Sequence, residues 1–395
     1  MRTQTEMAKH PFHDIVLAGV HNTVQAKRLD GHTSESITLE AVRGVMDDAG
    51  ITPRDIDGVS VASGGRSGLF QPSHFAYLLG LGPAWNGWTN GQGIGAVLEA
   101  ASAIATGQCH TVIIGAGSAG VYTELASTAP WTRPHNEFVA SWGLFTAAEF
   151  ALIARRHMHM YGTTPWQLAT VSATIRNNGH INPDAIYQGR GPFTPQDILD
   201  SRMVADPFHL LDCAMTSEGG CGIIVTTAER ARDMKQPPIY LLGGARERNG
   251  PSYCYPPTWE QTGYVGRDAA RKSFDMAGMT HEDVDDCEFY DPFSFEIIRQ
   301  FEAFGFCGEG EGGDFIMNGA IELDGKYPIC TDGGLMSFSH GGSAVQLLQK
   351  VIAGVKQLRG EAGNRQLSDP RVAMSTNGGA GALFTDVMLM GKEQP

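Results

Sequence analysis

The chain has 395 residues, enough for two or three core-forming units at roughly 150 residues each. Its 29 Lys and Arg against 43 Asp and Glu give a formal net charge of −14, so nucleic acid or an anionic membrane surface would repel it. Hydrophobic residues make up 42% of the chain, yet no apolar stretch reaches the ~18 residues of a membrane span. These values argue against a nucleic-acid or membrane partner and favour a globular enzyme.

The cysteines argue against a disulfide framework and against a structural metal site. They are odd in number and form no Cys-x-x-Cys pair, and the amino terminus lacks the apolar core of a signal peptide. We therefore expect a reducing, cytoplasmic compartment. His157 and His159 are two residues apart and point to opposite sides of a helix, so we expect no metal site there.

The first predicted unit is a helix, a turn and a strand. Residues 41–57 read AVRGVMDDAGITPRDID, in which the helix ends at Gly50 and an apolar strand follows at residues 59–61. A loop with the sequence NGWTNGQG then opens a helix that runs through Ala105. The amino end of a helix dipole is positive, so this loop suits a carbonyl oxygen or an oxyanion. Its candidate residues are Asn90, Gly91 and Gly93.

A strand at residues 111–116 precedes extra length that we place at residues 118–212. Within it, residues 142–161 and 165–177 have helical periodicity. Arg155-Arg156-His157 reads as a basic, solvated face, with a lid or ligand-binding role as the alternative.

The same helix, turn and strand then recur. Residues 269–285, AARKSFDMAGMTHEDVD, match residues 41–57 without gaps at eight of seventeen positions. The offset of 228 residues divides the chain into two related halves, residues 1–236 and 237–395, with Pro237-Pro238 as the linker. Alternating strands and helices in each half predict an α/β fold with a pseudo-twofold, whose active site lies where helix amino termini converge.

Three loops of the second half carry polar residues that packing alone would not require. Tyr290-Asp291-Pro292-Phe293 follows the repeated strand, and a loop from Ser337 to Gly342 places His340 near the start of a helix, which favours a neutral imidazole. A strand at residues 372–376 runs into a Gly-rich turn from Ser375, whose N–H groups could cradle an anion. A structural turn or a simple helix cap is the alternative for each loop. The candidate residues are Tyr290, Phe338, His340, Ser375, Asn377, Gly378, Gly379 and Gly381.

Together these motifs resemble the thiolase superfamily, in particular thiolases of the sterol-carrier-protein type and their thiolase-like relatives. The likeness covers nearly the whole chain and rests on DAGITPRDID, ARRHMHMYGTTPWQLATVS, DILDSRMVADPFHLLDCAMTSEGG, YDPFSFEII, DGGLMSFSHGG and NGGAG. The resemblance implies a duplicated thiolase fold of five layers, αβαβα, with two pseudo-twofold halves and a loop insertion in the first. It also implies a homodimer, and coenzyme A as part of a thioester substrate rather than a covalently bound cofactor.

The catalytic positions depart from the thiolase pattern. Asn90 stands where thiolases carry the nucleophilic cysteine, and Ser375 stands at the acid/base cysteine. Tyr290 replaces the histidine of the HDCF-like motif, whereas His340 retains the histidine of the HP-x-G motif. Claisen condensation and thiolysis proceed through an acyl-cysteine, so we do not expect thiolase activity.

The resemblance extends to thiolase-like aldolases that shorten steroid side chains. We expect retro-aldol cleavage of a bulky β-hydroxyacyl-CoA to a ketone or aldehyde and a shorter acyl-CoA, with Tyr290 as acid or base. His340, Asn90 and the turn of residues 377–381 would hold the enolate oxygen. The subgroup works with a small OB-fold, zinc-ribbon partner, which would carry the zinc. Tyr253 and Tyr255 are further candidates near the pocket, with rigid packing between prolines as the alternative.

Two other functions stay open. The chain could be a non-catalytic acyl-CoA-binding or scaffolding subunit, because duplicated folds that lose their nucleophile adopt such roles. It could also be a thiolase-like acyltransferase, although Asn90 counts against that reading because those enzymes resemble thiolases in keeping the cysteine.

Overall fold

The computed structural model describes residues 10–63, 72–82, 85–87, 93–120, 146–250, 258–341, 343–379 and 383–394, without the side chains of residues 62, 63 and 343–346. Its main sheet has nine strands in the order β3-β2-β4-β7-β1-β8-β11-β10-β9, and β5 and β6 form a separate pair. In chain order the strands are β1 (Ile15–Asn22), β2 (Gly58–Ser63), β3 (Trp85–Asn86), β4 (Thr111–Ser118), β5 (Met203–Ala205), β6 (Phe208–His209), β7 (Gly219–Thr227), β8 (Ile239–Arg248), β9 (Asp286–Glu288), β10 (Val372–Gly379) and β11 (Phe384–Gly391).

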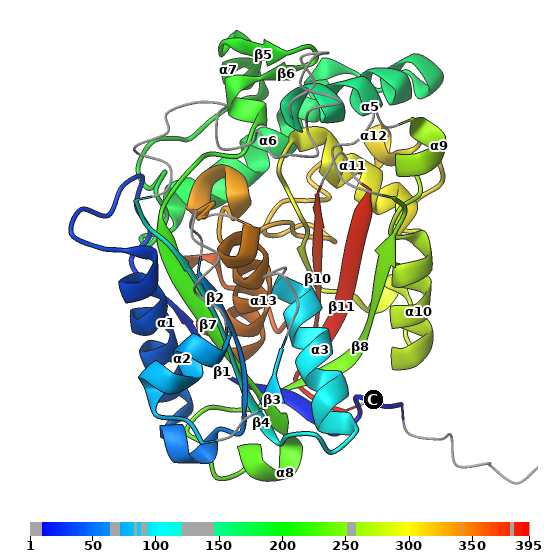
Figure 1. Cartoon of the computed structure of the whole chain (residues 1–395). Coiled ribbons are helices and arrows are strands. Elements are labelled where there is room, and N and C mark those ends of the chain that lie inside the picture. The colour runs from blue at the N-terminus through cyan, green and yellow to red at the C-terminus, as the bar shows by residue number, and fades with distance from the viewer. Residues whose placement is uncertain are drawn as a thin grey trace, which may run out of the picture.

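Helices pack on the outer face of each half of this sheet, between the two halves, and over one end of the sheet. They are α1 (Ser34–Ala49), α2 (Pro72–Leu79), α3 (Gly93–Ala105), α5 (Thr146–Tyr161), α6 (Pro165–Ile181), α7 (Pro195–Asp200), α8 (Ala228–Ala231), α9 (Trp259–Thr262), α10 (Arg267–Ala277), α11 (Ser294–Ala303), α12 (Gly312–Phe315) and α13 (Ser343–Arg359). Helix α1 packs on β1, β4 and β7, and α10 packs on β8 and β11. Helices α3 and α13 contact strands of both halves and lie between them (Figure 1). The predicted αβαβα layering is confirmed.

The two copies of the repeat have the same local structure. Both α1 and α10 end at a glycine in the left-handed conformation, Gly50 with φ +70° and Gly278 with φ +65°. Each is followed by one 3₁₀ turn and a strand, β2 or β9, that pairs in parallel with β4 or β10. The halves meet where β1 and β8 pair at Val16↔Tyr240 and Leu17↔Ile239. The pseudo-twofold is therefore present, and the division of the chain after residue 236 stays a prediction.

The central layer is an apolar core shared by both halves. Ile94 and Val97 of α3 and Val351 and Ile352 of α13 are fully buried in one cluster with β-strand residues of both halves, such as Ile223. Each Å² of apolar surface removed from water contributes about 25 cal/mol, so the burial of these side chains stabilises the contact between α3 and α13. The amino-terminal ends of these two helices therefore keep a fixed position relative to each other.

The described part of the insertion from residue 146 lies at the top of the molecule in Figure 1, where α5, α6, α7, β5 and β6 are found. The prediction of a solvated face was wrong for His157, which is fully buried with its Nε2 3.0 Å from Glu302 Oε1 and its Nδ1 3.0 Å from Thr163 Oγ1. This helix face packs on α9 and α11, and the His157 ring lies against Trp259 and Phe295. Arg155 and Arg156 are exposed as expected.

The helix predicted at residues 142–161 begins at Thr146, and residues 142–145 lie outside the described part of the chain. Within the described residues, no helix combines the length and the apolar character that a membrane crossing requires.

Candidate functional site

Tyr290 lies at the end of the turn that follows β9, and its backbone is fixed on both sides. Its N–H donates to Thr376 Oγ1 at 2.9 Å, and its carbonyl accepts from Gln300 Nε2 at 2.7 Å. The ring is 6% exposed and lies on Gly378 of β10, where a Cβ would come within 2.9 Å of Tyr290 Cδ1. Glycine is thus required at residue 378 for the tyrosine to lie this close to the strand.

His340 lies between a π-helical turn, Gly334–Phe338, and the start of α13. The backbone N–H of His340 donates to Ser217 Oγ at 2.7 Å. The ring Nδ1 is 2.5 Å from the carbonyl oxygen of Met215. A carbonyl only accepts, so Nδ1 carries the proton and Nε2 of the neutral ring is an acceptor. Burial and, to a smaller extent, the positive charge of Lys350 lower the pKa of His340 to about 4, against the opposing effect of the Met215 hydrogen bond. His340 is therefore a neutral hydrogen-bond acceptor near pH 7.

A bridging segment, residues 213–217, connects two parts of the site. One is the Tyr290 turn, residues 289–292, and the other is the His340 turn, residues 334–340, which includes the π-helical turn. Its Ala214 N–H donates to the carbonyl of Pro292 at 2.8 Å, and its Met215 N–H donates to the carbonyl of Leu335 at 3.2 Å. Met215 and Ser217 then hold His340 as described above. Sequence reasoning assigned no role to these residues, although their place in the run DCAMTSEGG was the signal that could have found them.

The amino-terminal turns of α3 and α13 meet beside this region. A Cβ on Gly93 would lie 2.3 Å from the carbonyl carbon of Leu347 in α13, so the two helices touch at backbone distance. Gly95 lies over Asp386 of β11, where a Cβ would be 3.2 Å from Oδ2. The predicted convergence of helix amino termini is thus present at Gly93. Asn90 and Gly91 lie outside the described residues, and their roles stay predictions.

Ser375 and Asn377 of β10 have defined partners. Ser375 is buried, and its hydroxyl donates to the carbonyl of Lys350 in α13 at 3.1 Å. Both ends of the Asn377 amide bind Asp386: Nδ2 donates to Oδ2 at 3.0 Å, and Oδ1 accepts from the N–H at 2.9 Å. Asp386 also pairs with Arg248. The roles predicted for Ser375 and Asn377 remain untested by this geometry.

The turn predicted to begin at Ser375 was placed too early. Strand β10 continues to Gly379, because β11 pairs with it at Asn377↔Asp386, Gly378↔Thr385 and Gly379↔Phe384. Gly381, Tyr253 and Tyr255 lie outside the described residues. Phe338 is buried, and its carbonyl accepts from the N–H of Ile186. Its role as a substrate contact stays a prediction.

The described cysteines are all poor nucleophiles. Burial raises the pKa of Cys109, Cys213 and Cys307 to about 12. The same cause raises the pKa of Cys221, Cys287 and Cys330 well above the usual range. Since the thiolate is the reactive species, none of these six thiols is prepared for covalent catalysis.

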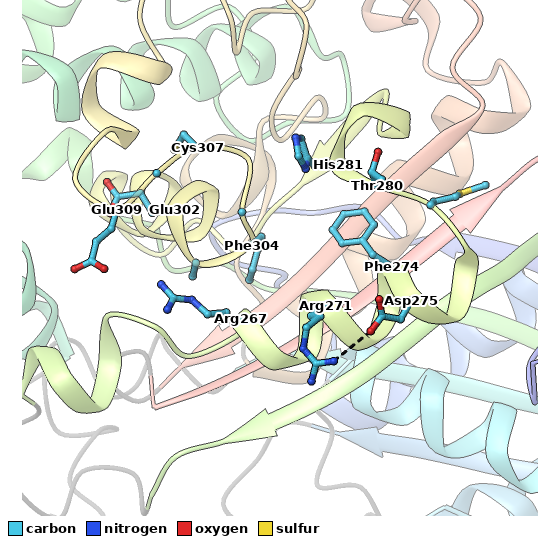
Figure 2. Close-up of a pocket in the computed structure, with 14 residues that line it drawn as sticks. Arg267, Arg271, Phe274, Asp275, Thr280, His281, Glu302, Phe304, Cys307 and Glu309 are labelled. Carbon is cyan, nitrogen blue, oxygen red and sulfur yellow. Dashed lines mark hydrogen bonds and ion pairs between the residues drawn. The ribbon is translucent and has the colours of Figure 1, made fainter.

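A separate pocket of about 520 Å³ lies on the outer side of the carboxyl-terminal half, between α10 and the segment after α11 (Figure 2). Arg267, Arg271, His281, Cys307 and Glu309 are among the residues that line it. Arg271 bonds Asp275 of the same helix, at 3.2 Å. None of the residues predicted for the site lines this pocket, and its thiol is the weakly acidic Cys307.

Comparison with known proteins places this geometry in a family. Residues 259–392 match the model of the thiolase C-terminal domain-like family. The chain is 34% identical over 361 residues to the 17-hydroxy-3-oxo-4-pregnene-20-carboxyl-CoA lyase of Mycobacterium tuberculosis, covering 85% of this chain and 89% of that protein. The chain belongs to the thiolase superfamily. It is also 32% identical to the acetyl-CoA acetyltransferase of Methanothermobacter thermautotrophicus, over 93% of this chain and 97% of that one.

Among solved structures, the chain is similar to the Ltp2-ChsH2(DUF35) aldolase, with a TM-score of 0.82 and 28% identity over 97% of this chain and 99% of that one. The resemblance stated from the sequence and the predicted thiolase fold are confirmed. The lyase and the aldolase also confirm the predicted class of activity, a carbon–carbon lyase of the thiolase-like aldolase type that acts on acyl-CoA.

Proposed function

We propose that the chain cleaves a bulky β-hydroxyacyl-CoA by a retro-aldol reaction, with His340 as the base and Tyr290 as the acid. The observation that carries the assignment is the state of His340, a neutral ring whose Nδ1 is occupied by Met215 and whose Nε2 is left to accept a proton. This changes the role expected from the sequence, because a ring with its proton on Nδ1 has no N–H at Nε2 to hold an enolate oxygen.

The reaction balances with these two residues. His340 Nε2 takes the proton of the β-hydroxyl, the Cβ–O bond becomes a carbonyl, and the Cα–Cβ bond breaks with its electron pair moving into the thioester enolate. The Tyr290 phenol gives its proton to Cα, which yields the shorter acyl-CoA, and the proton on His340 returns to the phenolate. The positive ends of the α3 and α13 dipoles favour the enolate charge. Both residues are neutral again after each turnover.

The poor acidity of the described thiols supports this reaction over acyl transfer through cysteine. We propose a steroid side-chain thioester, or one of similar bulk, as substrate, in line with the name of the lyase relative. The paired name of the structural relative supports a DUF35-type partner, which we take to be the expected OB-fold, zinc-ribbon protein. We also propose a homodimer, on the resemblance alone, and a cytoplasmic location, on the cysteine content and the amino-terminal sequence.

The test is cleavage of a β-hydroxyacyl-CoA with a tertiary carbinol, by the chain alone and with a DUF35-type partner. Chromatography should detect a ketone and a shorter acyl-CoA. Thioester binding without any product, with and without the partner, would instead support a scaffolding subunit.

A further inference from the structure

A buried ion pair lies next to Tyr290 in the chain and contacts the turn that precedes His340. Lys350 Nζ of α13 is 2.5 Å from Oδ1 of Asp291, the residue that follows Tyr290 in the chain. The Lys350 side chain is 2% exposed and that of Asp291 is fully buried. Burying two charges costs several kcal/mol each before their attraction is counted, so such a pair is weak as a source of stability alone.

Asp291 joins the turn of Tyr290 to the turn of His340. Its Oδ1 accepts the N–H of Leu335 at 3.0 Å, and its Oδ2 accepts the N–H of Met336 at 3.2 Å. Both donors belong to the π-helical turn that leads into His340. Gly334 allows this approach, because a Cβ there would lie 2.3 Å from Asp291 Oδ2. One carboxylate thus holds the backbones of both turns.

Lys350 is the cation among several acidic groups. Its Nζ also donates to Cys330 Sγ at 3.2 Å. Burial opposes its charge, but Asp291, Cys330, Glu288 and Asp332 together raise the pKa of Lys350 above its usual value. Lys350 is therefore charged near neutral pH, and its charge is one of the causes that lower the pKa of His340. The groups that contact His340 from the bridging segment, the Met215 carbonyl and the Ser217 hydroxyl, are uncharged.

We propose that Lys350 and Asp291 are positioning residues, which hold the backbone segments that carry Tyr290 and His340 in a fixed relation to each other. The inference rests on the proposed function for its effect on rate. The effect of Lys350 on the pKa of His340 does not depend on that function, because a positive charge disfavours a second positive charge nearby.

The two partners should affect His340 in opposite ways. Lys350→Met removes the positive charge, so the pKa of His340 should rise. Asp291→Asn removes the negative charge that neutralises Lys350, so the pKa of His340 should fall below that of the wild type. General damage to the fold would not produce this opposition between two buried neighbours.

The experiment measures kcat, KM and the titration of His340 by NMR in both single variants and in the double variant. We expect kcat to fall roughly 10-fold or more in each single variant with KM within about 3-fold. The double variant should show a loss similar to that of the poorer single variant, since the pair acts as a unit. Arg359→Met is the matched control. It removes a buried cation at the other end of α13, where Arg359 pairs with Asp48 at 3.4 Å, and should leave kcat within about 2-fold.

Wild-type kcat in Lys350→Met, together with an unchanged His340 titration, would overturn the inference. If Lys350→Met does not fold, the uncharged double variant replaces it, and wild-type kcat in that variant would overturn the inference as well. If the wild type shows no cleavage at all, the proposed function fails, while the His340 titration still decides whether Lys350 acts on the ring.

Discussion

His340 Nδ1 and the carbonyl oxygen of Met215 form the hydrogen bond that determines how the imidazole can act. With its proton directed to Met215, the ring has the lone pair of Nε2 to accept a hydrogen bond or a proton. The bond also ties the His340 turn to the bridging segment, which contacts the Tyr290 turn through Ala214 and Pro292. The chemical state of one residue and the position of the other thus depend on the same short segment.

Tyr290→Phe tests the proposed acid. Loss of the phenolic proton should lower kcat roughly 10²-fold or more, since general acid catalysis contributes about that much, while thioester affinity stays near the wild type. Tyr77→Phe is the matched control, because Tyr77 is 83% exposed on α2 and has no proposed role in the reaction. Normal turnover by Tyr290→Phe would remove this residue from the mechanism.

His340→Gln tests the base and its pH dependence. In the wild type, kcat/KM should fall as the pH drops through about 4, because the imidazole must be unprotonated to accept the substrate proton and its pKa is about 4. Glutamine preserves a hydrogen-bonding side chain but does not titrate, so the variant should lose roughly 10²-fold in kcat together with this acid limb. A pH–rate profile of the same shape in both proteins would show that His340 is not the base.

Gly378→Ala tests the close approach of the tyrosine to β10. The new Cβ would lie 2.9 Å from Tyr290 Cδ1, so the ring must shift. We expect a fall in kcat of about 10-fold or more and a loss of unfolding free energy on the order of 1 to 3 kcal/mol. Gly82→Ala is the control, since its Cβ meets nothing within 4 Å. Equal kcat in the two variants would argue against a fixed position for Tyr290.

Glu149→Gln tests a buried carboxyl on α5. Its Oε2 has no hydrogen-bond partner among the described residues, and burial raises the pKa of Glu149 from 4.5 to about 7. Because the folded-state pKa is the higher one, the destabilisation is absent below pH 4.5 and grows as the pH rises towards 7. It reaches about 3 kcal/mol at pH 8, at 1.36 kcal/mol per pKa unit.

Glutamine does not ionise, so urea unfolding of Glu149→Gln should show a smaller loss of stability between pH 4.5 and 8 than the wild type. Parallel stability curves for the two proteins would mean that Glu149 ionises without cost.

The sequence predicts the repeated part of this fold well, because its signals are local. Gly50 and Gly278 terminate equivalent helices, and the apolar strands that follow them appear where the pattern places them. Contacts between distant segments were not predictable in this way. The length of β10 depends on pairing with β11, and the burial of His157 depends on α9 and α11.

The same distinction between local signals and long-range contacts applies to the candidate site. Tyr290 and His340 could be found because each stands in a motif with a family counterpart. Their partners in the bridging segment are distant in sequence, because Met215 is 125 residues and Ser217 is 123 residues from His340 along the chain. The run DCAMTSEGG could have marked these residues as part of the site, but a single sequence does not show that they contact His340. The Lys350–Asp291 pair was hidden for the same reason, since a lone lysine in an amphipathic helix reads as exposed.

The most direct test of the account is to run the cleavage in D₂O without free coenzyme A and to analyse the products by mass spectrometry. The retro-aldol reaction predicts one deuterium at the α-carbon of the shorter acyl-CoA, an equal amount of ketone and no acylated protein. Cleavage only when coenzyme A is added, or an acyl group bound to a cysteine, would contradict it.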